Sequence, residues 1–157
     1  MPLAADLPGV TAPEPGSPVV TTDGLGGWLR GLSGCPQVTD TVVLECRSAR
    51  HDGQAERPTW FFCEADAAHG VARVRCVPCG QARGLLDSDA HWTYPPMHAC
   101  PGCAQSMVEV AVGVHAEPDR AVTWAVVAVR CVACGRVDGM TALHVPRLPL
   151  EEVLATL

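Results

Sequence analysis

The chain has 157 residues, a formal net charge of −6 and nine cysteines. The length allows one ordinary domain or two small ones. The acidic charge disfavours nucleic acid as a partner, because such binding depends on counterion release by basic side chains. The longest apolar run, residues 125–129, is far too short to cross a bilayer, so we expect no membrane partner.

Residues 1–24 are rich in Pro, Gly, Ala and Thr and show little apolar periodicity, which predicts a disordered tail. Residues 1–10 lack the basic start and apolar stretch of a secretory signal, so we expect a cytoplasmic location. In a reducing compartment, paired cysteines are more often metal ligands than disulfides. Residues 25–32 predict one or two helical turns, with Trp28 on the apolar side.

Short strands are predicted from residue 41 onward, beginning with Thr41–Glu45. Residues 60–63 and 71–75 predict a hairpin, because both runs are rich in β-branched or aromatic residues and a Gly-containing segment joins them. Residues 107–116 and 121–130 predict a longer hairpin around the turn Glu117–Arg120.

The second strand of the longer hairpin is apolar on both faces, so it needs cover on both sides. That cover would come from the first half of the chain, from the C-terminal segment or from a second subunit. The residues assigned to one face are Val122, Trp124, Val126 and Ala128, and those assigned to the other are Ala125, Val127 and Val129.

Residues 149–157 predict a short C-terminal helix, with Pro149 in its first turn and two glutamates near the positive end of its dipole. One face carries an apolar stripe at helical spacing. We expect this stripe to pack on its own domain, with binding of a partner as the alternative. The stripe consists of Leu150, Val153, Leu154 and Leu157.

Three Cys-x-x-Cys pairs dominate the chemistry of the sequence. Two thiolates separated by two residues can hold one metal ion from a single tight turn, and two such turns complete the tetrahedron that zinc prefers. The pairs are Cys76/Cys79, Cys100/Cys103 and Cys131/Cys134.

An internal repeat indicates which pairs belong together. Residues 74–80 (VRCVPCG) match residues 129–135 (VRCVACG), and each follows a strand-like run and ends in Gly. That Gly suits a loop with positive φ, whose backbone N–H groups turn towards the thiolates. The two segments therefore correspond to each other, and the pair at 100 and 103 opens the second unit. One metal site is predicted from Cys100, Cys103, Cys131 and Cys134.

The order of the second unit, over about residues 98 to 145, is Cys pair, strand, turn, strand, Cys pair. This order resembles the zinc-ribbon (rubredoxin-like knuckle) superfamily, here duplicated. The resemblance implies a small, mostly-β, metal-stabilised fold of two tandem zinc-ribbon-like units with a short C-terminal helix. The units would span residues 25–90, which departs from the pattern, and residues 91–157.

The first unit keeps one Cys pair and lacks the other, because the residues equivalent to 100 and 103 are Glu45 and Ser48. Cys63 is favoured as a buried apolar residue and Cys35 as a free structural cysteine. The predicted ligands are Cys76 and Cys79 with Cys46 and His51, and the rivals for the remaining positions are Cys63 and His69.

The predicted cofactor is Zn²⁺, one or two ions per chain, with iron as a substitute that the same sulfurs would hold. The histidines at 91, 98, 115 and 144 are scattered and suggest no catalytic arrangement, so no catalytic residue is assigned and we expect no enzyme.

The function expected from the sequence is a protein-interaction or assembly module, whose partner is another protein or a second copy of the chain. The strand at 121–129 and the C-terminal apolar stripe are the candidate contact surfaces. The alternatives are a nucleic-acid-associated or transcription-related zinc ribbon, which the acidic charge disfavours, and a rubredoxin-like electron carrier.

Overall fold

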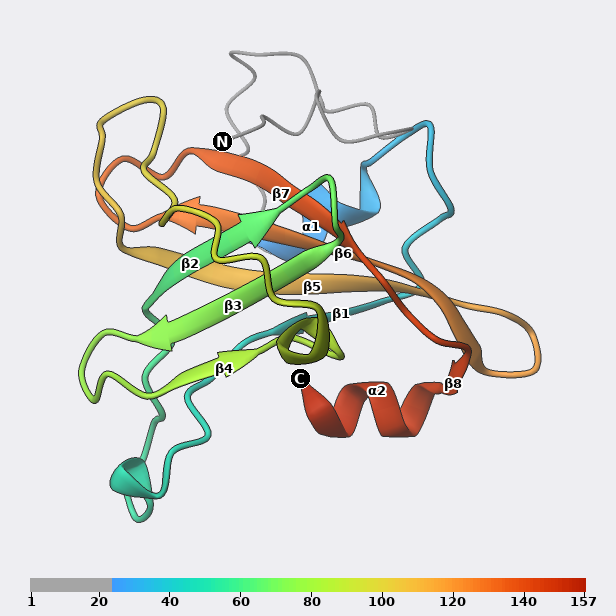
Figure 1. Cartoon of the computed structure of the whole chain (residues 1–157), viewed down its shortest axis with the longest axis horizontal. Helices are drawn as coiled ribbons and strands as arrows, with labels where there is room; N and C mark the ends of the chain where they lie inside the picture. The colour runs from blue at the N-terminus through green and yellow to red at the C-terminus, as the bar shows by residue number, and fades with distance from the viewer. Residues whose placement is uncertain (1–23) are drawn as a thin grey trace.

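The computed structural model describes residues 24–157 (Figure 1), so the predicted tail lies outside the described residues except for Gly24. The chain folds into a mostly-β structure with short helices at both ends of the described part. The elements, in order, are α1 (Gly24–Arg30), β1 (Asp40–Val43), η2 (Ala49–His51), β2 (Phe61–Asp66), β3 (Val71–Cys76), β4 (Ala82–Gly84), η3 (Ser88–His91), β5 (Val108–Ala116), β6 (Ala121–Cys131), β7 (Val137–Leu143), β8 (Leu148–Pro149) and α2 (Leu150–Thr156).

Both predicted hairpins are confirmed. β2 and β3 pair antiparallel from Phe61↔Cys76 to Asp66↔Val71, and β4 adds a short third strand beside β3. β5 and β6 pair antiparallel along their length, and β7 adds a third strand beside β6. Each half of the chain therefore contains three consecutive antiparallel strands, with a Cys-x-x-Cys turn between the second and the third.

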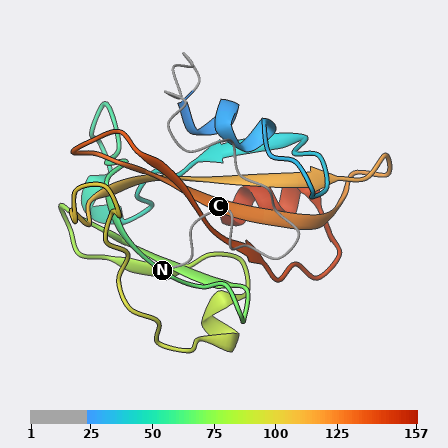
Figure 2. The same ribbon diagram turned by 90° about the horizontal axis from the view of Figure 1, so that it is seen from above.

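The strands form one sheet in the order β4-β3-β2-β5-β6-β7, with β1 beside β5 and β8 beside β6. A single residue pair, Phe61↔Val108, joins the two three-stranded halves. From this corner the β2–β3 hairpin turns under the β5–β6–β7 layer, while α1 covers the opposite side of that layer (Figure 2). The division into units 25–90 and 91–157 stays a prediction.

β6 is covered on both faces, as its apolar pattern predicts. Val127 and Val129 face the larger core, which lies between the two strand layers and includes residues of α2. Val126 and Ala128 face the smaller core under α1. The prediction that this strand offers a surface to a partner is wrong, because all four residues are at most 1% exposed.

The assignment of Val122 to the Val126 face is also wrong. Val122 packs in the larger core with Ala125 and Val127. The pairing of β5 with β6 changes register between His115 and Ala116, so the simple alternation of side chains fails across Thr123.

Helix α2 docks on its own chain. Leu150, Val153 and Leu157 are at most 5% exposed and belong to the larger core, which confirms the preferred prediction for the C-terminal stripe. Two arginines hold the end of the helix. Arg83 donates to the carbonyl of Leu157 at 2.6 Å, and Arg47 donates to the carbonyl of Ala155.

Within residues 24–157, no helix has the length and apolar character needed to traverse a bilayer.

Candidate metal centres

The three Cys-x-x-Cys turns share one backbone arrangement, and we call each of them a knuckle. In every knuckle the carbonyl of the first cysteine accepts the N–H of the residue that follows the second cysteine. These bonds are Gly80 to Cys76 at 2.8 Å, Ala104 to Cys100 at 2.7 Å, and Gly135 to Cys131 at 2.9 Å. The three knuckles are therefore the same local structure at three places in the chain.

The residue after the second cysteine is left-handed in all three knuckles. Its φ is 72° at Gly80 and 77° at Gly135, which confirms the sequence argument for those glycines. The knuckle at Cys100 and Cys103 has Ala104 at this position, with φ 63°, a conformation that costs an L-residue about 1–2 kcal/mol. One of the three knuckles is thus strained where the other two are relaxed.

The second half brings two knuckles together. We call the resulting group the four-cysteine cluster: Cys100, Cys103, Cys131 and Cys134. The Sγ–Sγ distances are 3.6 Å between Cys100 and Cys134 and 3.5 Å between Cys103 and Cys131. The N–H of Gly102 also points at Cys100 Sγ, at 3.4 Å. Cys131 is the last residue of β6, so the long hairpin itself positions this cluster.

The first half completes its single knuckle with two residues from an upstream loop. We call this group the mixed cluster, since it combines three thiols with one imidazole: Cys46, His51, Cys76 and Cys79. Cys46 Sγ lies 3.7 Å from Cys79 Sγ, and His51 Nε2 lies 3.6 Å from Cys76 Sγ. Cys76 ends β3, whereas His51 belongs to the short 3₁₀ helix η2, which Ser48 caps by accepting the N–H of Arg50.

Both clusters have the dimensions of a tetrahedral zinc site. Four sulfurs at about 2.3 Å from a central zinc stand about 3.8 Å apart, and a sulfur and an imidazole nitrogen stand about 3.6 Å apart. Two separations in each cluster, between 3.5 and 3.7 Å, agree with these values, and all the ligand atoms of a cluster lie within 4.8 Å of one another. The residues present therefore fit the metal, and each cluster is positioned to hold one ion.

The pKa values of the thiols differ sharply within a cluster. The backbone N–H of Gln81 is the main cause that lowers the pKa of Cys79 to about 6, whereas burial raises the pKa of Cys76 to about 12. In the four-cysteine cluster, burial raises the pKa of Cys131, but hydrogen bonds from the Cys134 backbone and the Cys103 thiol outweigh it and bring it to about 7. The lowered pKa values make Cys79 and Cys131 ready to ionise near neutral pH, and a bound divalent ion requires its thiol ligands to lose their protons.

The rival ligands lie outside both clusters. Cys63 is fully buried in the larger core, as favoured from the sequence, and His69 is exposed and pairs with Asp66. Cys35 is a free cysteine that packs against the core under α1. His98, two residues before Cys100, is buried among residues of the sheet and is not part of the four-cysteine cluster.

Sequence reasoning missed a third group of potential ligands. The structure brings His144 to Asp87 and His91, which lie more than 50 residues earlier in the chain and only four residues from each other.

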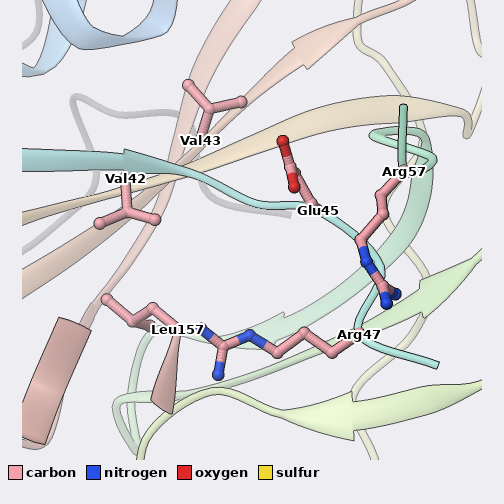
Figure 3. A pocket seen from close by; sticks show the side chains of 6 residues that line it. All are labelled: Val42, Val43, Glu45, Arg47, Arg57 and Leu157. Carbon is pink, nitrogen blue, oxygen red and sulfur yellow. The ribbon is translucent and has the colours of Figure 1, made fainter. Parts of the chain in front are cut away.

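Two surface hollows lie beside the mixed cluster. One, of about 460 Å³, is lined by Cys46 together with the arginines at 47, 50 and 83. The other, of about 400 Å³, is lined by Val42, Val43, Glu45, Arg47, Arg57 and Leu157. In it the Arg47 side chain extends along the floor towards the end of α2 (Figure 3). Three arginines of the loop that supplies Cys46 and His51, together with Arg83 of β4, therefore line these hollows.

No family model, curated protein or solved structure matches this chain.

Proposed function

We propose that this chain is a non-catalytic zinc-binding protein in which two zinc ions hold a duplicated, ribbon-like fold, and whose surface serves another protein or a second copy of the chain. The observation that carries the zinc assignment is the ligand count. Each cluster offers four protein ligands within 4.8 Å of one another, which fills a tetrahedral shell and leaves no position for substrate or water.

The chemistry of the mixed cluster favours zinc over iron. Three cysteines with a histidine, and four cysteines, are both ligand sets of structural zinc sites, whereas an electron-carrying iron site of the rubredoxin kind would use four sulfurs. The imidazole of His51 therefore supports zinc in the mixed cluster. We extend the zinc assignment to the four-cysteine cluster, because its knuckles have the same geometry as the knuckle of the mixed cluster.

The interaction role is supported by exposed side chains. Tyr94 is 84% exposed and Trp60 is 47% exposed, in a chain that buries most of its apolar residues in two cores. Tyrosine and tryptophan are the residues most enriched at the energetic centres of protein interfaces. These two, rather than the buried strand β6, are the positions at which we expect a partner to bind.

The test of the zinc assignment is the metal content of the full chain, purified without chelator, with zinc and iron counted together. We expect two zinc ions per chain. One zinc ion would mean that the mixed cluster is a degenerate copy, iron would move the assignment towards electron transfer, and absence of metal would overturn the proposal.

The interaction role is tested by sedimentation velocity over a range of protein concentrations, on the wild-type chain and on Trp60→Ala and Tyr94→Ala variants. A concentration-dependent dimer that weakens in either variant would support a second copy as the partner. A strict monomer in all three would exclude self-association and leave only a different protein as the partner.

One observation favours the nucleic-acid alternative. Four of the eleven basic residues, at 47, 50, 57 and 83, line the two hollows beside the mixed cluster, and so gather positive charge in an acidic protein. Their donors are partly engaged, since Arg57 donates to the carbonyls of Cys46 and Ser48. A gel shift at low salt that is lost in Arg50→Ala would support this alternative, and absence of a shift would exclude it.

A further inference from the structure

A third group of ligand-type side chains lies away from both cysteine-containing clusters. Asp87, His91 and His144 each offer one ligand atom, and these atoms all lie within 4.8 Å of one another. Asp87 Oδ2 is 2.8 Å from Nδ1 of His144 and 3.7 Å from Nε2 of His91. The two imidazole rings stand edge to face, with centroids 5.9 Å apart.

The elements that carry these residues are held by several long-range contacts. Ser88, next to Asp87, is fully buried, and its hydroxyl accepts the N–H of Ala72 at 2.9 Å and donates to the carbonyl of Leu85 at 2.6 Å. His144 is held through its backbone, whose N–H donates to the carbonyl of Gly70 at 3.1 Å. The three ligand positions are therefore preorganised by the fold, which is what a specific site requires.

The Asp87 carboxylate is oriented towards the imidazoles and not towards its own helix. Asp87 occupies the N-cap position of η3, where an aspartate commonly accepts a backbone N–H, yet its side chain makes no such bond. Among residues 24–157, its ion-pair partners are the two histidines. Asp87 is thus the shared centre of the group, with one oxygen near both rings.

The geometry points to a third metal site, formed by Asp87, His91 and His144, that binds Zn²⁺ or a similar borderline divalent ion in exchangeable form. Imidazole nitrogens and a carboxylate oxygen suit such ions. Ligand atoms about 2.0–2.1 Å from a four-coordinate zinc stand about 3.3 Å apart, between the two measured separations.

The third site differs from the four-cysteine and mixed clusters in two ways. It offers three protein ligands, so solvent completes the shell, and its histidines are exposed, at 61% and 63% of their side-chain surface. An exposed, three-ligand site releases its ion far more readily than a buried four-ligand site. The inference is independent of the metal content proposed for the two clusters.

The experiment is a calorimetric titration of Zn²⁺ into the full chain as purified, with tightly held metal counted beforehand by mass spectrometry. We expect one further equivalent of weaker binding. His91→Ala and Asp87→Asn should each weaken that binding by at least about tenfold, because loss of a direct ligand exceeds the effect of losing an outer-shell partner. Tightly held metal should remain unchanged, which separates this site from the clusters.

The matched control is His69→Ala. His69 is equally exposed, at 61%, and pairs with Asp66 at 2.8 Å, but it stands outside the group. Its removal should leave the weaker equivalent intact. Absence of that equivalent in the wild-type chain, or its persistence in the His91→Ala/Asp87→Asn double variant, would overturn the inference. His91 is exposed and Asp87 is half-buried, so unchanged tightly held metal also serves as the check that the variants fold.

Discussion

The four-cysteine cluster and the mixed cluster each contain a knuckle of the same structure, but the other two ligands come from different kinds of segment. In the second half, both knuckles flank one long hairpin, so the sheet fixes all four ligands together. In the first half, the knuckle at Cys76 meets two ligands from the loop between β1 and β2, which contains only the short η2. The strands therefore position the four-cysteine cluster, whereas the mixed cluster draws two of its four residues from a loop with little regular structure.

The largest expected effect is the loss of the metal of the four-cysteine cluster in Cys131→Ser. β6, which Cys131 ends, pairs with β5, β7 and β8, so we expect unfolding of the whole sheet and a loss of more than about 4 kcal/mol. Cys76→Ser should cost less, because its cluster secures mainly a loop. Denaturant unfolding of both variants is the measurement, and equal losses would contradict the comparison.

The next effect concerns the ligand that distinguishes the two clusters. His51→Ala should weaken metal binding at the mixed cluster by more than about 100-fold, since a direct ligand is lost. The loop should then open, and trypsin should cleave faster after Arg50.

His51→Cys is the matched control, because it restores a fourth thiolate and should keep both the metal and the protease resistance. Rapid cleavage of the wild-type chain at Arg50 would show that the loop is open even with the metal bound.

A smaller effect is expected at the left-handed residue of each knuckle. Gly135→Ala should destabilise by about 1 kcal/mol through backbone strain alone, because an added Cβ meets nothing within 4 Å. Ala104→Gly should stabilise by up to about 1 kcal/mol for the same reason. Thermal unfolding measures both, and a stabilising Gly135→Ala would refute the strain argument.

The smallest effect separates two arginines at equivalent positions of the repeat. Arg130 pairs across the strands with Glu109, whereas Arg75 donates to the carbonyl of Gly80 inside its own knuckle at 3.1 Å. Arg130→Ala should cost about 0.5 kcal/mol and should lose that cost at high salt, since the pair is partly exposed. Arg75→Ala should be insensitive to salt, and unfolding in low and high salt distinguishes the two.

Local sequence patterns are sufficient for most of the strands. Alternating and β-branched runs predict β2, β3, β5 and β6, because a strand pattern is visible in a few residues that are close together in the sequence. The match between residues 74–80 and 129–135 shows that these two knuckles are equivalent, and so assigns the knuckle at 100 and 103 to the one at 131 and 134. This argument compares the sequence only with itself. Both arguments need no knowledge of the tertiary structure.

The remaining features depend on contacts between distant segments. The face of Val122 depends on a register change against β5, which no strand pattern encodes. The choice of His51 over His69 depends on where the β1–β2 loop runs, and the group at Asp87 forms only when η3 and the segment after β7 meet. Sequence spacing left both His51 and His69 as candidates for the mixed cluster, and it gave no indication of the group at Asp87.

Arg47 links the end of α2 to the mixed cluster. Arg47 directly follows Cys46 of the mixed cluster and donates to the carbonyl of Ala155, so one short stretch of backbone contributes to both the cluster and the docking of the helix. If metal binding at the mixed cluster raises the equilibrium constant for docking of α2 by some factor, then docking of α2 raises the metal affinity by the same factor, because coupling between two equilibria is reciprocal. A protein or small molecule that lifts α2 would therefore lower the metal affinity of the mixed cluster by the same factor, without contacting any of its four residues.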